Sequence, residues 1–424
     1  MAGTMRHEGL LLNEATLKAE RELLVSRAAT FGAGVTTASP HLSIVDLPSS
    51  LVPTHSIEKS FVVLIDVQRM TTTLTTALAE GAEKVRVFTE IEEVQAAAKE
   101  YEEAARLRGG ERHGQQIPGF DGDNSPRAYL RSVLDLRGKT LLFTTTNGSK
   151  AAQFVKEAAE LVLGSFVNLQ AVRRAALSRG YPVLLVCSGT AGERSEEDEL
   201  FAGVLALQLL QIHSRTAASV PVQGEVADPL TLEIVERVAS ILGVAIEITV
   251  SGKPDKRAER VSGAADVGPP AQRAMELEQT IRNSTNGLML AQLGLVDDFQ
   301  IILDVDRYSD TLPVYNRSAD CFTIPQNTID KHAAKRQRCA DEEKSRICRR
   351  CKQDFEPSKN DATSCRYHPE IFSGETKQRW MTAGDTNGLG EIHYFWTCWC
   401  VHFLFRFTHT VCFHILGHLE TMHD

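Results

Sequence analysis

Hydrophobic and polar positions alternate in a regular way along most of this chain. Residues 1–40 are largely polar, and from Phe61 short apolar runs are separated by longer amphipathic stretches. The run at 61–67 (FVVLIDV) is almost continuously apolar, which is typical of a strand buried on both faces. Further strands are expected at 85–88, 140–144, 161–163, 182–187 and 244–250.

The stretches between these strands have helical spacing. Ile91, Val94, Ala98, Tyr101 and Ala105 predict a helix that ends near 109–110, and other helices are expected around 154–159 and at 198–211. Repeated alternation of strand and helix predicts an α/β fold in which helices cover both faces of a sheet.

Composition divides the chain of 424 residues. All three Trp lie at or after Trp380, and seven of the nine Cys lie at or after Cys339. Two early cysteines are no disulfide framework, and no secretory signal is recognised, so a cytoplasmic protein is expected. We predict a polar leader (1–40), an enzyme-like domain (41–317), a basic linker (318–344), a Cys/His-rich domain (345–400) and an aromatic, His-rich tail (401–424).

Charge limits the partners. The net charge of −9 argues against broad binding of nucleic acid. The basic run at 332–338 is typical of a solvated linker, with a nuclear-localisation signal as the alternative. The apolar stretch 401–419 contains Arg406 and four histidines and is short for a membrane-spanning helix, so an atypical tail is favoured over membrane contact.

Polar side chains gather where the predicted strands end, which is where α/β sheets bind ligands. The first strand ends at Asp66, and Arg69, Thr71 and Thr72 follow at a helix start. A carboxylate can ligate a metal, and an arginine can bind two phosphate oxygens. The alternative is a capping threonine and a surface ion pair.

Glu111, Arg112 and Asp121 lie in a glycine-rich loop of about eighteen residues, and loops of that length are usually functional or disordered. The apolar Ile117 and Phe120 in the same loop argue against disorder.

Two more turns follow predicted strands. The turn at 144–149 resembles a phosphate-binding turn but lacks the lysine of a P-loop. In the turn at 187–198, Glu197 and Asp198 lie at the start of a predicted helix. They are expected to be either metal ligands or favourable charges at the helix N-terminus. A Cys187 thiolate nucleophile is the less favoured hypothesis, because six residues separate it from Arg194 and cysteine phosphatases need five. The candidate phosphate-binding residues of both turns are Thr144, Thr145, Thr146, Asn147, Gly148, Ser188 and Gly189.

Together these clusters favour metal-assisted phosphoryl chemistry on a small anionic substrate. The candidate ligands of Mg²⁺, or bases that orient water, are Asp66, Glu111, Asp121 and Asp198. Arg69 and Arg112 are expected to hold the phosphate or another anionic group, while the turn at 144–148 stabilises the transition state.

The same segments resemble the 2-phosphosulfolactate phosphatase (ComB-like) family. The matching stretches are IDVQRMTTTLTTALAEGA, GGERHGQQIPGFDGDNSP, GKTLLFTTTNGSKA, VCSGTAGERSEEDELFAG and a closing NSTNGLMLAQLGLVDDFQ. Over residues 41–317, the resemblance implies a three-layer α/β/α fold and Mg²⁺-dependent hydrolysis of 2-phosphosulfolactate to sulfolactate and phosphate. Gln68 and Met70 stand where the family usually has Leu and Ala.

The C-terminal domain has zinc-ligand spacing, C-x2-C-x13-C-x2-H, in Cys348, Cys351, Cys365 and His368. Its surroundings resemble CHORD-like domains, and a second site that includes His393, Cys398 and Cys400 stays open. So small an irregular domain needs metal to fold, which predicts structural Zn²⁺ and a role in binding a protein partner.

Two functions are weighed. The first is a phosphatase for a small phosphorylated hydroxy acid, monomeric or oligomeric. The second is a non-catalytic scaffold that binds a phosphorylated ligand and engages a partner through its zinc domain.

Overall fold

A computed structural model of the chain divides it into two compact units, Met1–Thr328 and Ile329–Asp424. It describes residues 10–13, 15–19, 41–52, 55–213, 222–251 and 270–325, together with five short strands in the second unit. No helix within these ranges is long and apolar enough to cross a membrane.

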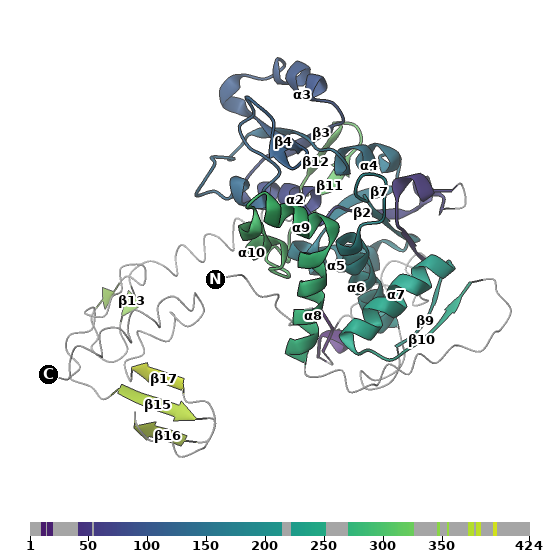
Figure 1. Cartoon of the computed structure of the whole chain (residues 1–424), viewed down its shortest axis with the longest axis vertical. Coiled ribbons are helices and arrows are strands. Elements are labelled where there is room, and N and C mark those ends of the chain that lie inside the picture. Colours follow the sequence, from purple (N-terminus) through teal and green to yellow (C-terminus); the bar gives the residue numbers. More distant parts are fainter. Residues whose placement is uncertain are drawn as a thin grey trace. The chain divides into compact units, whose positions relative to one another are not determined.

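A ten-stranded mixed sheet forms the centre of the first unit (Figure 1). Its strand order is β1-β8-β2-β7-β11-β12-β3-β6-β4-β5. In sequence order, the strands are β1 (Leu42–Val45), β2 (Phe61–Ile65), β3 (Lys84–Phe88), β4 (Arg106–Arg112), β5 (Gln115–Gln116), β6 (Thr140–Thr144), β7 (Glu160–Gly164), β8 (Val183–Cys187), β11 (Val314–Asn316) and β12 (Cys321–Thr323).

The sheet consists of two parallel groups joined by an antiparallel hairpin. Strands β1, β8, β2 and β7 pair in parallel, as do β3, β6 and β4. The hairpin β11–β12 connects the groups through antiparallel pairing of β11 with β7 and of β12 with β3. A separate parallel pair, β9 (Val222–Val226) and β10 (Ile246–Val250), lies beside β1, where the Ala227 N–H donates to the Leu42 carbonyl over 2.9 Å.

Hydrophobic packing on both faces of the sheet confirms a layered α/β architecture. In β2, Val63 and Ile65 pack into one core together with Leu205 of α6, whereas Val62 and Leu64 pack into another together with Leu74 of α2. This alternation follows from the two-residue repeat of a strand. The longer helices are α2 (Met70–Glu80), α3 (Ile91–Ala98), α4 (Gly148–Val155), α5 (Leu169–Arg179), α6 (Glu196–His213), α7 (Pro229–Leu242), α8 (Pro270–Asn283) and α9 (Thr285–Gln292).

The helix expected from Ile91 to Ala105 is shorter than predicted. It ends at Ala98, and the residues around Gly109 and Gly110 form strand β4. A Cβ at Gly109 would collide with the Tyr129 hydroxyl, so the glycine permits a close approach that helical periodicity cannot reveal.

The limits of the first unit extend beyond residues 41–317. Leu10, Leu12 and Leu17, which lie in the segment expected to be a polar leader, are buried in the larger core. Strand β12, which falls in the expected linker, pairs through Phe322 with Val85 of β3. In both segments a few apolar residues are surrounded by polar ones, so the average polarity of the segment hid the residues that pack into the first unit.

The second unit contains two small antiparallel sheets. Strands β13 (Arg346–Ile347) and β14 (Asp354–Phe355) pair with each other. Strands β15 (Phe372–Thr376), β16 (Arg379–Thr382) and β17 (His393–Trp396) form a three-stranded sheet in the order β16-β15-β17. The side chains of the expected zinc ligands, the basic run at 332–338 and the tail after 400 lie outside the described residues.

Candidate functional site

The carboxyl end of β2 carries Asp66 at the boundary with α2. The preceding strand is wholly buried, and Asp66 itself is only 6% exposed. Its Oδ1 accepts the backbone N–H of Met70 over 3.1 Å, which ties the carboxylate to the start of α2. A Cβ at position 148 would collide with Asp66 Oδ2 and with the Met70 sulfur. Gly148 therefore lets α4 begin directly against this carboxylate.

The start of α6 brings two more acids to the same region. Asp198 Oδ1 accepts the Val67 N–H over 2.8 Å, and its Oδ2 accepts the Ser188 hydroxyl over 3.2 Å. Glu197 Oε1 accepts the Asn286 amide over 2.6 Å. These bonds join the ends of β2 and β8 to the first turn of α6.

Glu111 approaches from the other parallel group of strands. Its Oε1 accepts the Thr146 N–H over 2.8 Å and its Oε2 accepts the Gly114 N–H over 2.7 Å. Arg112 donates to the Thr89 carbonyl and to Thr144 Oγ1, over 2.8 and 3.0 Å. The turn after β4 is thereby fixed against the loop after β6.

Electrostatics identifies Asp66, Glu111, Glu197 and Asp198 as one acidic cluster. Burial, reinforced by the charges of Glu111 and Glu197, raises the pKa of Asp66 to about 7, against the Met70 hydrogen bond that lowers it. Burial and the charges of Glu197 and Asp66 raise the pKa of Asp198 well above its ordinary value. Burial and mutual repulsion therefore disfavour full ionisation of the cluster.

Arg69 is the cation next to this cluster. It is 2% exposed, and its Nη1 lies 2.9 Å from Oδ2 of Asp298, which is equally buried. Its Nη2 donates to the Gly114 carbonyl over 3.2 Å. The positive charge of Arg69 lowers the pKa of Asp66, while Asp298 and the Gly114 carbonyl hold the guanidinium.

The hydroxyls expected to bind phosphate differ in their partners. Thr71 and Thr72 donate to the backbone carbonyls of Asp66 and Val67, over 2.8 and 2.9 Å. Thr145 Oγ1 accepts the Ser149 N–H over 3.1 Å. Thr146 Oγ1 is buried without a hydrogen-bond partner among the described residues. Thr146 is therefore the hydroxyl best suited to meet a ligand.

The remaining candidates lie at the edges of the cluster. Asn147 Oδ1 accepts the Ala191 N–H over 3.3 Å. Gly189 has a φ of +70°, and a Cβ there would lie 2.7 Å from the Glu193 carbonyl, so the turn requires glycine. Asp121 is 34% exposed and lies 3.5 Å from Arg108 Nε, so its carboxylate faces a different cation from the one beside Asp66.

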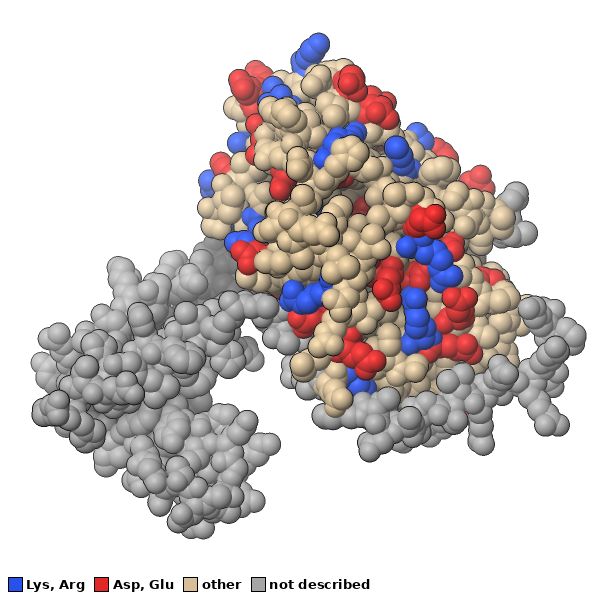
Figure 2. All heavy atoms as spheres, viewed as in Figure 1, with Lys and Arg blue, Asp and Glu red and all other residues tan. Residues whose placement is uncertain are grey.

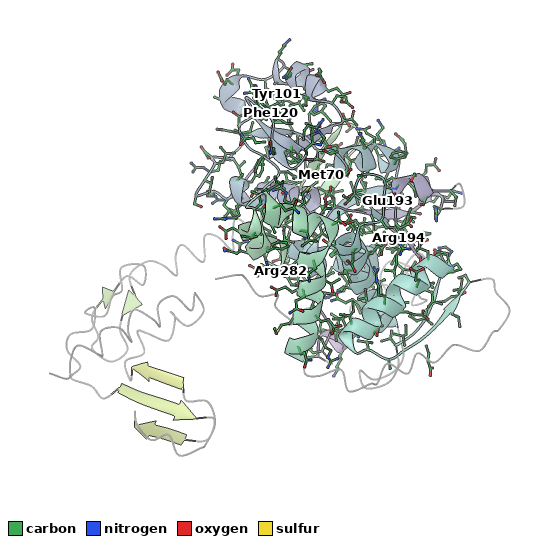
Figure 3. All side chains as sticks on the ribbon, in the orientation of Figure 1. Met70, Tyr101, Phe120, Glu193, Arg194 and Arg282 are labelled. Carbon is green, nitrogen blue, oxygen red and sulfur yellow. The ribbon has the colours of Figure 1, made fainter. Side chains whose placement is uncertain are left out.

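Cys187 has the properties of a core residue. It is fully buried, and burial together with neighbouring carboxylates raises the pKa of its thiol well above the ordinary value. Arg194 pairs with Glu199 and Glu233. In Figure 3, Arg194 is labelled on the side of α7, whereas Met70 marks the centre of the unit. Burial and the surrounding carboxylates therefore disfavour a thiolate nucleophile at Cys187.

The sequence reasoning missed the partners that come from the C-terminal part of the unit. Asp298 pairs with Arg69, and Asn286 bonds both Glu197 and Thr190, the latter over 2.6 Å. Both lie in the closing segment noted for its resemblance, but no local motif singled out either side chain. Glu197 was considered as a metal ligand or a helix-terminal charge, but it was not included among the candidate site residues.

Comparisons with known proteins cover the part of the chain that contains this cluster. The model of the 2-phosphosulpholactate phosphatase family matches residues 47–227, which contain all four acids of the cluster. A probable 2-phosphosulfolactate phosphatase of Caldanaerobacter subterraneus is 41% identical over 144 residues, which are 34% of this chain and 59% of the relative. One of Prochlorococcus marinus is 41% identical over 166 residues, 39% of this chain and 65% of the relative. The chain thus spans about three-fifths of these relatives' length.

Proposed function

We propose that the first unit is a phosphatase that hydrolyses a small phosphorylated hydroxy acid, with 2-phosphosulfolactate as the first substrate to test. The observation that carries this proposal is the buried acidic cluster beside Arg69 at the carboxyl ends of the strands. The family match over residues 47–227 and the names of the relatives support the same reaction. A phosphoric monoester gives the reaction an anion for Arg69 and a leaving oxygen that needs a proton.

Mg²⁺ is the cation that we propose for the cluster. No three His, Cys, Asp or Glu side chains in the described ranges are arranged as a ready metal site. Mg²⁺ usually takes one or two carboxylates and completes its shell with water and substrate phosphate. Asp66 and Asp198 fit this smaller requirement, because each is buried and the charge of one raises the pKa of the other. Bound there, Mg²⁺ would neutralise charge on the phosphoryl oxygens.

The chain's own groups divide the remaining work. We assign Arg69 to bind the phosphate and Thr146 to donate its hydroxyl to a phosphoryl oxygen. Glu197 accepts the proton of the attacking water and returns it to the leaving oxygen as the ester P–O bond breaks. Glu111 holds the Thr146 and Gly114 backbone in place, and Arg112 supports that turn. Asp121 was an equal candidate ligand in the sequence, but we favour it less because its carboxylate lies beside Arg108.

The experiment is a phosphate-release assay on the full chain. It uses 2-phosphosulfolactate and a panel of phosphorylated hydroxy acids, with Mg²⁺ or with EDTA. We expect turnover with Mg²⁺ and little with EDTA. If a substrate raises the melting temperature but releases no phosphate, the scaffold function is favoured instead.

We further propose that Cys348, Cys351, Cys365 and His368 hold a structural Zn²⁺ in the second unit. The support is their spacing and the pairing of β13 with β14, because the first cysteine pair lies in the sequence between these two strands. A CHORD-like domain of this kind would bind a protein partner. The test is the zinc content of the purified chain, which Cys348→Ser should lower while phosphate release stays within about twofold.

A further inference from the structure

The segment from Ile281 to Asp298 contacts the loops that carry the acidic cluster. The Gln68 amide donates to the Ile281 carbonyl over 3.2 Å, and Asn286 donates to Glu197. A Cβ at Gly114 would meet the Leu293 side chain. This segment lies outside residues 47–227, yet it supplies partners to three of the site loops.

The contact between Asp298 and Arg69 is the most enclosed of these. Both side chains are 2% exposed. One carboxylate oxygen of Asp298 faces Arg69 Nη1 over 2.9 Å, and the other accepts the Ser125 hydroxyl over 2.5 Å. Asp298 therefore has a fixed orientation of its own and can impose one on the guanidinium.

The neighbouring residue provides an internal comparison. Asp297 pairs with Arg127 over 2.5 Å, but these side chains are 57% and 45% exposed. Exposed pairs of this kind contribute little to stability or geometry. Two adjacent aspartates thus bind two arginines, one pair at the surface and the other beside the cluster.

We propose that Asp298 is a positioning residue that orients Arg69 to bind the phosphoryl group of the substrate. A guanidinium is a rigid plane of five N–H donors, and fixing two of them fixes the direction of the rest. Asp298 and the Gly114 carbonyl fix one donor on each terminal nitrogen. The inference rests on the proposed function, because it takes Arg69 as the phosphate ligand.

The test measures binding of inorganic phosphate by calorimetry, and KM and kcat for the best substrate of the panel, all with Mg²⁺. Asp298→Asn keeps the size of the side chain and removes its charge. We expect phosphate affinity to fall about tenfold, as loss of one charge-assisted hydrogen bond would give, and KM to change more than kcat. Asp297→Asn is the matched control and should change affinity less than twofold.

A second pair of variants distinguishes positioning from general support of the fold. In an Arg69→Lys background, Asp298→Asn should cause no further loss of phosphate affinity, because its effect passes through the guanidinium. Ser125→Ala removes one hydrogen bond to Asp298 but leaves its ion pair with Arg69 intact. It should lower phosphate affinity about threefold, and it can be measured even if Asp298→Asn does not fold.

Three results would overturn the inference: equal phosphate affinity in Asp298→Asn and Asp297→Asn, full additivity with Arg69→Lys, or a loss of stability with unchanged phosphate affinity. Wild-type protein that binds phosphate but releases none from any substrate would overturn the proposed activity. The phosphate-binding comparison would still decide the role of Asp298.

Discussion

The first turn of α6 contains three adjacent acids that differ in whether an arginine pairs with them. Glu197, Asp198 and Glu199 are each about 1% exposed. Glu199 accepts Arg194 Nε over 2.5 Å and Arg237 Nη2 over 2.6 Å. Among the described residues, Glu197 and Asp198 have an amide, a hydroxyl and a backbone N–H as hydrogen-bond partners but no ion pair.

This difference separates structural acids from functional ones. The charge of Glu199 is neutralised by its two arginine partners. One of them, Arg237, belongs to α7, so this ion pair links α6 to α7. Buried carboxylates without a cation destabilise the fold, and such groups are typical of sites that bind or react. Figure 2 shows acidic and basic side chains interspersed on the face that it draws.

The largest effect is expected for a substitution in the acidic cluster. Asp66→Asn should lower kcat/KM about 10²–10³-fold, because it removes a cluster carboxylate assigned to the cation. Folded-state stability should not fall, since the variant also removes buried negative charge. The measurements are phosphate release and chemical unfolding. Unchanged activity in Asp66→Asn would remove Asp66 from the site.

A stability profile against pH sharpens the comparison. Asp66 has a pKa of about 7 in the folded state against an ordinary value of 3.8. Between these values the folded protein holds a proton that the unfolded chain has released, so the free energy of unfolding falls as pH rises. One such group contributes at most about 1.4 kcal/mol per pH unit, and Asp198 acts in the same direction.

The control for this profile is Asp66→Asn, whose stability relative to wild type should rise from pH 4 to pH 7 and then level off. Added Mg²⁺ at pH 8 should stabilise the wild type and have much less effect on the variant. A constant difference between the two proteins across this range would contradict the raised pKa.

Strand ends could be predicted from the sequence because burial on both faces leaves a continuous apolar run. Strands β2, β6 and β8 begin and end within two residues of the expected positions, which places Asp66, Thr144 and Ser188 at one edge of the sheet. The β4 segment could not be predicted in this way, because its glycines hid a strand that packs against Tyr129.

The choice of partners could not be predicted. Arg69 and Arg194 both follow strand ends and look alike in the sequence, but Arg69 finds Asp298, 229 positions away, and Arg194 finds Glu199 five positions away. Which carboxylate lacks a cation depends on such distant contacts. Periodicity and local spacing contain no information about them.

A smaller effect is expected at Glu199, the acid that is paired with two arginines. Glu199→Gln should lower the free energy of unfolding by about 1–3 kcal/mol, because it breaks two ion pairs at a buried carboxylate. Arg194 and Arg237 are 40% and 37% exposed, so water solvates the guanidiniums that remain. Phosphatase activity measured below the melting temperature should stay within about twofold of wild type. A loss comparable with that of Asp66→Asn would show that the two sides of the turn are not distinct.

The smallest effect is expected for Cys187, which lies beside both groups of acids. Cys187→Ala should leave kcat within about twofold of wild type and cost about 1 kcal/mol of stability, because only a small buried sulfur is lost. Nearby carboxylates and burial keep the thiol protonated, so no nucleophile is removed. The measurements are phosphate release and thermal unfolding of the two proteins side by side. A large loss of activity in a well-folded Cys187→Ala protein would show that reaction at this strand end depends on sulfur and not on the carboxylates around it.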